Sequence, residues 1–286
     1  MNQKLLLSIG YLGNLVLYIL CLKAINLMLG QYNIVFCCVI FGWFFPIALI
    51  HFIYNRIALE NINIVLGLLD YIQLILLYVG LNELNVAEYI SYRTIAIIFN
   101  VMLSAYFFQK LFTKIQILGV LFILASCIIL LYMGGINNLL YSCVILLSSF
   151  VYAVSGYLME ANKDTGNMIQ IKLVSSFFNM TTYTLYSLFY NNIFTLLEGK
   201  KDYKLIGCVI FMGSSEYIYY YLKLQIISIF EDGSIFINVL DIIRRIITLI
   251  ISIIIFKETY FDYIYYCYSI IVIGCILFYI KPIQIN

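Results

Sequence analysis

Charged side chains are scarce in this sequence. Only 10% of the 286 residues are Asp, Glu, Lys or Arg, whereas 64% are hydrophobic, and the mean hydropathy is +1.03. A soluble domain of this length could not cover so much apolar surface, so the composition excludes that class and predicts an integral membrane protein in a lipid bilayer. The net charge of +2 is too small to indicate a nucleic-acid partner.

The side chains that usually carry catalysis or bind metals are also scarce. His51 is the only histidine, and no nucleotide-binding loop is present. The eight cysteines lie inside apolar runs without metal-ligand spacing, as expected for small side chains that fill space between helices. We therefore expect no enzyme activity, no metal site and no cofactor.

Long polar loops are absent, and apolar runs fill the chain. A helix needs about 20 mostly apolar residues to cross a bilayer. Segments of this kind predict an all-α polytopic protein with ten transmembrane helices, at residues 5–25, 32–54, 62–82, 86–108, 115–133, 138–159, 168–190, 205–229, 234–256 and 262–280. None of the breaks could hold a soluble domain, so function is expected between the helices.

The second half of the chain resembles the first. Residues 89–132 align with residues 237–280 at an offset of 148, and Asp70 aligns with Glu216 at an offset of 146. With five spans in each half, the two copies must cross in opposite directions, as in the inverted repeats of many secondary transporters. The expected units, within one membrane domain, are residues 1–133 and 134–286.

The expected orientation follows from the lysines and arginines in the breaks between the spans. Those of the first half favour a cytosolic N-terminus, whereas those of the second half favour the opposite orientation. The first helices usually dominate this choice, so we expect both termini in the cytosol.

Ionisable residues fall inside the predicted spans, where they are costly and usually face a cavity or a partner. Structural ion pairs are one alternative to a functional role. A second alternative is that long side chains near helix ends reach the membrane interface, especially those of Lys172 and Lys223. Arg93, Arg244 and Arg245 lie too far inside their helices for snorkelling to explain them well. The full set is Asp70, Arg93, Lys172, Glu216, Lys223, Asp241, Arg244 and Arg245.

Two polar stripes place these charges at helical spacing. Asp241, Arg245, Thr248 and Ser252 share one helix face, and the repeat-equivalent face carries Arg93, Asn100 and Ser104. Both faces should point inward. Asp241 can pair with Arg244 or Arg245, and the charge of the other arginine is then not neutralised by Asp241.

Surplus guanidinium groups favour phosphate or carboxylate ligands, because they bind these groups in a bidentate manner. We therefore expect an anion site, with a phosphate ester as the best fit. Asp70 and Glu216 would balance charge or carry protons. The remaining binding candidates are Lys172, Asn179, Tyr220 and Lys223.

Two motifs resemble those of a known family. Leu84-Asn85-Val86 followed by Arg93 to Asn100 is similar to the helix-4 motif of GDP-mannose carriers, although Thr94 replaces its second arginine. Arg244-Arg245 followed by Thr248 and Ser252 resembles the helix-9 motif of nucleotide-sugar carriers and the cation pair of triose-phosphate translocators. The GALNK motif of GDP-mannose carriers is absent. The chain thus resembles the drug/metabolite transporter superfamily, in its solute carrier 35 and triose-phosphate branch.

The resemblance implies ten helices, an anionic substrate and phosphate ligands at Arg93, Arg244 and Arg245. We expect a nucleotide sugar to be exchanged for a nucleoside monophosphate, in a Golgi or ER membrane if the source is eukaryotic. Two alternatives remain: a proton-coupled metabolite exporter that uses Asp70 and Glu216, and a non-transporting membrane scaffold of the same fold. A homodimer is left open.

Overall fold

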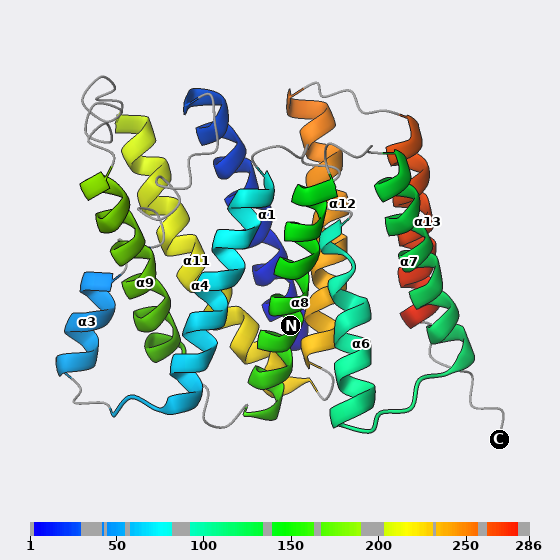
Figure 1. The fold of residues 1–286 in the computed structure, drawn as a ribbon, viewed down its shortest axis with the longest axis horizontal. Coiled ribbons are helices and arrows are strands. Elements are labelled where there is room, and N and C mark those ends of the chain that lie inside the picture. The colour runs from blue at the N-terminus through cyan, green and yellow to red at the C-terminus, as the bar shows by residue number, and fades with distance from the viewer. Residues whose placement is uncertain are drawn as a thin grey trace.

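The structure is a computed structural model, and the part of the chain that it describes is helical throughout, apart from short turns. No strand occurs in that part (Figure 1). The all-α prediction is therefore confirmed for these residues. They are residues 3–29, 42, 45–54, 58–81, 92–133, 139–162, 167–189, 203–230, 233–256 and 262–279.

Each of the ten expected apolar segments contains a helix. Most boundaries agree with the sequence expectation to within a few residues, because polar breaks separate the apolar runs. The helices are α1 (Gln3–Leu29), α3 (Phe45–Tyr54), α4 (Asn61–Leu81), α6 (Ala96–Phe107), α7 (Lys114–Met133), α8 (Leu139–Ala161), α9 (Met168–Phe189), α11 (Tyr203–Ile229), α12 (Gly233–Phe256) and α13 (Asp262–Tyr279).

Two helices in the described residues are long and apolar enough to cross a membrane. They are α7, with a mean hydropathy of 2.6 over its most apolar window, and α8, with 1.8. These helices match the expected spans 115–133 and 138–159. For the other expected spans, membrane crossing stays a prediction.

One expected helix is interrupted. The sequence predicted a continuous helix over 86–108, but a turn at Thr94 and Ile95 precedes α6. The backbone amides of Ile95, Ile97 and Ile98 donate to carbonyls three residues back rather than four, so the chain is wound more tightly here than in an α-helix. Tyr92 and Arg93 are helical, so Arg93 lies directly before this turn rather than within α6. Residues 82–91 and most of 32–44 lie outside the described part.

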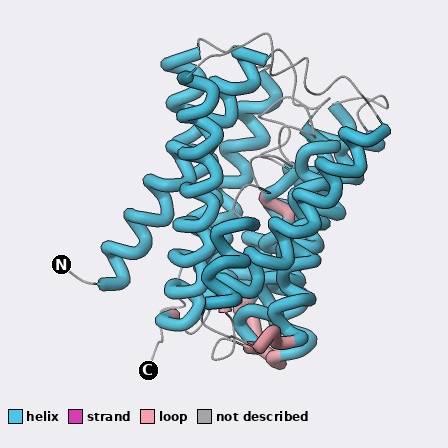
Figure 2. The backbone as a smooth tube through the Cα atoms, turned by 90° about the vertical axis from the view of Figure 1, so that its left-hand side faces the viewer, coloured by secondary structure: helices cyan, strands magenta, loops and turns pink. Residues whose placement is uncertain are grey.

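The helices lie side by side, with α3 and α9 at one edge of the molecule and α7 and α13 at the other (Figure 1). Figure 2 shows the first turns of α1 extending away from the neighbouring helices. The helix α1 packs on α11 and α12, while α8 packs on α4 and α6. In the order of the two halves, α1 corresponds to α8, α4 to α11 and α6 to α12. The contacts of α1 therefore correspond to those of α8. The counterparts α7 and α13 pack directly on each other, as do α3 and α9, and α6 and α12.

The pair of α7 and α13 crosses at two glycines. A Cβ at Gly274 would lie 2.7 Å from the Gly119 carbonyl oxygen, and a Cβ at Gly119 would meet the Gly274 carbonyl oxygen even more closely. Further along, the Ser126 hydroxyl donates to the Cys267 carbonyl at 3.0 Å. Position 126 of α7 thus meets position 267 of α13 and position 119 meets 274, so the two helices run antiparallel.

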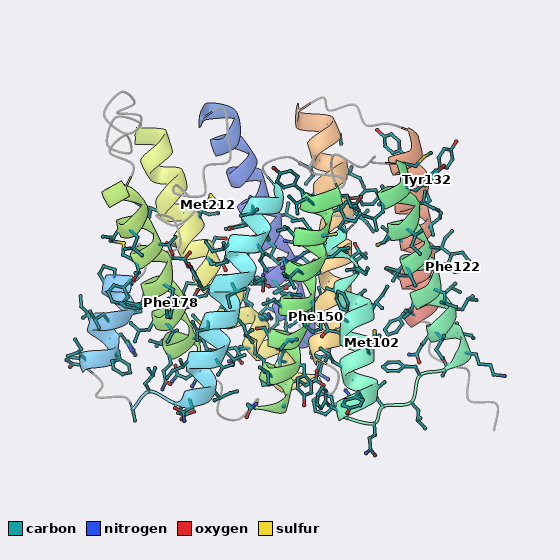
Figure 3. All side chains as sticks on the ribbon, in the orientation of Figure 1. Met102, Phe122, Tyr132, Phe150, Phe178 and Met212 are labelled. Carbon is teal, nitrogen blue, oxygen red and sulfur yellow. The ribbon has the colours of Figure 1, made fainter. Side chains whose placement is uncertain are left out.

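The distribution of side chains differs from that of a soluble protein. Six charged residues in the described part are at most 9% exposed and lie among apolar core residues, whereas many large apolar side chains are exposed on the outside. Met102 on α6 and Phe150 on α8, labelled in Figure 3, are 62% and 42% exposed. An apolar exterior around a charged interior suits a hydrocarbon solvent.

The glycine crossing generates a stability prediction. Gly119→Ala should destabilise the protein by roughly 1–3 kcal/mol, because a methyl group there collides with backbone and the helices must separate. The measurement is the apparent unfolding temperature in detergent, which should fall.

Gly13→Ala is the matched control, since nothing lies within 4 Å of a Cβ at Gly13. Alanine favours the helix by about 1 kcal/mol over glycine, so this variant should be at least as stable as the parent. Equal unfolding temperatures for Gly119→Ala and the parent would contradict the close crossing.

Candidate functional site

The buried charges meet in the middle of the helix bundle. They come from α4, α9, α11, α12 and the helical residues just before α6. Isolated charges in such a place are costly, so each needs a partner or a cavity. These residues, with their exposed fractions, are Asp70 (2%), Arg93 (5%), Lys172 (6%), Glu216 (9%), Lys223 (2%) and Asp241 (4%).

Lys172 on α9 bridges two carboxylates. Its ammonium donates to Asp70 Oδ2 at 2.9 Å and to Glu216 Oε1 at 3.1 Å. Asp70 also accepts hydrogen bonds from the hydroxyls of Ser175 and Tyr220, and the ammonium lies 3.7 Å from the centre of the Tyr220 ring. We call these five residues the Lys172 cluster; they join α4, α9 and α11. Asp70 and Glu216, aligned in the sequence, thus share one cation.

Asp241 on α12 is the centre of a second group. Tyr11 donates to its Oδ1 at 3.1 Å and Tyr152 to its Oδ2 at 2.9 Å, while Arg244 Nε lies 3.7 Å from Oδ1. We call these four residues the Asp241 cluster. The expected pairing of Asp241 with an arginine one turn later is therefore seen with Arg244.

Tyr152 on α8 lies between two further cations. The guanidinium carbon of Arg93 is 4.7 Å from the centre of its ring, and the ammonium of Lys223 is 4.4 Å from the same centre. Arg93 also donates to the Ser148 hydroxyl at 2.7 Å, and Lys223 lies 5.5 Å from the Tyr220 ring centre. The Tyr152 ring is therefore the contact that Arg93 and Lys223 have in common.

Neither Arg93 nor Lys223 has a carboxylate within ion-pair distance among the described residues. Lys172 and Arg244, by contrast, each have an acidic partner. Two nearly fully buried cations thus rest on aromatic and hydroxyl groups alone. Such an arrangement can accept an anion without first breaking an ion pair.

The other predicted binding residues are placed less uniformly. Asn100 on α6 and Thr248 on α12 are 3% and 2% exposed, and the Thr248 hydroxyl has no hydrogen-bond partner in the described part. Asn179 donates to the Ser175 carbonyl within α9. The side chain of Arg245 lies outside the described residues.

Sequence reasoning missed Ser148 and Tyr152. Both lie on one face of α8 with Ser155, at spacings of four and seven residues, and all three are buried. The Ser155 hydroxyl also lacks a hydrogen-bond partner among the described residues. This polar stripe in an apolar helix was the available signal, but a lone tyrosine in such a helix more often packs than binds.

Comparisons with known proteins find a similar fold and no similar sequence. No protein-family model and no curated protein matches the sequence. Among 24 matching chains of solved structures, one described only as "Crystal structure of protein" aligns with a TM-score of 0.62 and 11% identity. The alignment covers 95% of this chain and 94% of that one. The fold is therefore shared along nearly the whole chain.

The Lys172 cluster yields a second stability prediction. Lys172→Met leaves two buried carboxylates without their cation, which should cost about 3–5 kcal/mol of folding stability. The triple variant Lys172→Met, Asp70→Asn and Glu216→Gln removes all three charges and should recover much of the lost folding stability. The apparent unfolding temperature in detergent measures both effects.

Lys114→Met is the control for losing a lysine, since Lys114 is exposed at the start of α7. It should leave the unfolding temperature nearly unchanged. A Lys172→Met variant as stable as the parent would refute the compensating role of Lys172.

Proposed function

We propose that this chain is a secondary-active membrane transporter of an anionic phosphorylated solute, and that it exchanges a nucleotide sugar for a nucleoside monophosphate by alternating access. One observation carries the proposal. Arg93 and Lys223 are buried together beside Tyr152, with no acidic partner among the described residues. A solute with phosphate groups would supply the missing negative charge.

The membrane setting is supported by the distribution of side chains. The exposed surfaces of α3, α7 and α13 carry large apolar groups such as Ile53, Leu121 and Ile276, at 64%, 52% and 57% exposure. The charges lie inside, where polar groups of transport proteins form the path of the solute. Two helices also have the length and hydropathy for a full crossing.

The antiparallel contact of α7 and α13 supports two inverted repeats. At the offset of 148, Gly119 corresponds to Cys267 and Ser126 to Gly274. The contact of Gly119 with Gly274 therefore maps onto the contact of Cys267 with Ser126, and both are present. A pseudo-twofold axis in the membrane plane has this property, and inverted-repeat transporters bind solute near such an axis.

The charges also indicate which cations would bind the solute. Lys172 is already neutralised by Asp70 and Glu216, and Arg244 lies beside Asp241. Arg93 and Lys223 are then the contacts to the phosphate, with Lys172 fixing the surrounding helices. An arginine can bind two phosphate oxygens at once, while a lysine adds a point charge.

A second candidate rests on a different observation. Asp70 and Glu216 share a single ammonium, so this group of charges carries more acid than base. A proton or a cationic solute could replace Lys172 there, as in a proton-coupled metabolite exporter. The Golgi or ER location, the cytosolic termini and a homodimer stay predictions.

The test of the first candidate is uptake into proteoliposomes preloaded with nucleoside monophosphates, with labelled nucleotide sugars and sugar phosphates outside. Arg93→Gln and Lys223→Met should each reduce uptake about tenfold or more, since a hydrogen bond between charged groups is worth roughly 1.5–3 kcal/mol. Lys114→Met, which removes an exposed lysine, should transport like the parent.

Uptake of no phosphorylated solute by correctly inserted parent protein would refute the anion carrier. An imposed proton gradient would then decide the second candidate. In that case Asp70→Asn and Glu216→Gln should abolish uptake of a cationic metabolite, while Arg93→Gln should not.

A further inference from the structure

Tyr152 makes a combination of contacts that packing alone does not require. It is 3% exposed, and its ring lies beside two cations, Arg93 just before α6 and Lys223 on α11. Its hydroxyl donates to Asp241 Oδ2 at 2.9 Å and lies 3.4 Å from the Tyr219 hydroxyl. Because the Tyr152 proton is directed to Asp241, Tyr219 is the donor in the second contact. One side chain therefore connects four polar groups from three parts of the bundle: the residues before α6, α11 and α12.

The Tyr152 ring offsets part of the cost of burying the two cations. Arg93 and Lys223 repel each other, while the carboxylates of Asp70 and Asp241 attract Lys223 from a distance. A buried ammonium without hydrogen bonds is costly, and the face of an aromatic ring offsets part of that cost through its negative quadrupole. Arg93 has Ser148 as a further anchor. Lys223 has only ring faces among the described contacts.

The Asp241 carboxylate strengthens this arrangement. A hydrogen bond from the phenol to a carboxylate moves electron density toward the ring, which makes the ring face more attractive to a cation. The same bond anchors the phenol oxygen to α12, and Tyr11 on the other carboxylate oxygen holds Asp241 in place. The ring thereby stays beside the two cations.

We infer that Tyr152 is a positioning residue for the anion site: its ring holds Arg93 and Lys223 in the binding arrangement while the site is vacant. This inference rests on the proposed function for its transport consequence, but the position of Lys223 can be tested without transport. The solute phosphate meets two cations that are already in place. Binding therefore does not have to order the long Lys223 side chain, which would weaken affinity.

Two variants separate the ring from the hydroxyl. Tyr152→Phe keeps the ring and removes the bond to Asp241, whereas Tyr152→Leu removes the ring. In counterflow uptake, the KM for the phosphorylated solute should rise about tenfold in Tyr152→Leu, with a change in maximal rate of less than about threefold. Tyr152→Phe should keep the KM within about threefold of the parent. An equal rise in both variants would overturn the role of the ring.

A chemical readout is independent of transport. Purified protein in detergent is treated with a small amine-reactive anhydride, and labelling rates at Lys223 and Lys172 are followed by peptide mass spectrometry. Lys223 should react about tenfold faster in Tyr152→Leu than in the parent or in Tyr152→Phe, because its ammonium group has lost the contact with the Tyr152 ring. Lys172, held by Asp70 and Glu216, should react equally in all three and serves as the internal control.

The outcomes distinguish the two proposals. Faster labelling of Lys223 in Tyr152→Leu, without uptake of any anion by the parent, would support the positioning role and refute the transport proposal. Unchanged labelling of Lys223 in a folded Tyr152→Leu variant would overturn the positioning role, whatever the uptake. Faster labelling of Lys172 as well would indicate general loosening of the bundle and would also overturn it.

Discussion

The bridge from Lys172 to Asp70 and Glu216 is the interaction on which the rest of the interior depends. It joins α4, α9 and α11 by contacts of 2.9 and 3.1 Å, in a bundle whose outer surface carries many large apolar groups. Charges in such surroundings must be balanced from within. The Lys172 cluster contains two carboxylates and one ammonium, and the Asp241 carboxylate is contacted by hydroxyls and Arg244. Arg93 and Lys223 contact the Tyr152 ring without a carboxylate at ion-pair distance in the described part, and under our proposal this pair of cations binds an anion.

The alignment of the two halves indicates where the interior departs from symmetry. Arg93 and Asp241 occupy equivalent positions at the offset of 148. Arg93 contacts Ser148 on α8, and Asp241 contacts Tyr11 on α1, the counterpart of α8. Equivalent positions thus carry opposite charges at corresponding places in the two halves. In the proposed transporter, the scaffold has the symmetry needed to open toward either side, while the contacts at its centre are asymmetric. Under our proposal, the asymmetric centre binds the solute and the symmetric scaffold moves around it.

Much of the fold was predictable from the sequence, because apolar runs and polar breaks mark helices directly. The sequence singles out charged residues inside apolar segments, and six of them are buried: Asp70, Arg93, Lys172, Glu216, Lys223 and Asp241. Their partners could not be predicted. Which acid reaches Lys172 depends on how α4, α9 and α11 meet, and this is a property of tertiary contact. The turn at Thr94 and Ile95 could not be predicted from the sequence either. β-Branched residues in an apolar run are compatible with a continuous helix, so nothing in the local sequence marks a turn. Tyr152 was overlooked because its role comes from two cations on other elements.

The most direct measurement of the central claim is ligand-dependent stability of the purified protein in detergent. A solute that binds the folded state raises its unfolding temperature. Our account predicts that a nucleoside monophosphate raises this temperature, that the same nucleoside without phosphate does not, and that Lys223→Met abolishes the rise. An equal rise with the uncharged nucleoside, or a rise that persists in both Lys223→Met and Arg93→Gln, would contradict the claim that the buried cation pair binds the phosphate.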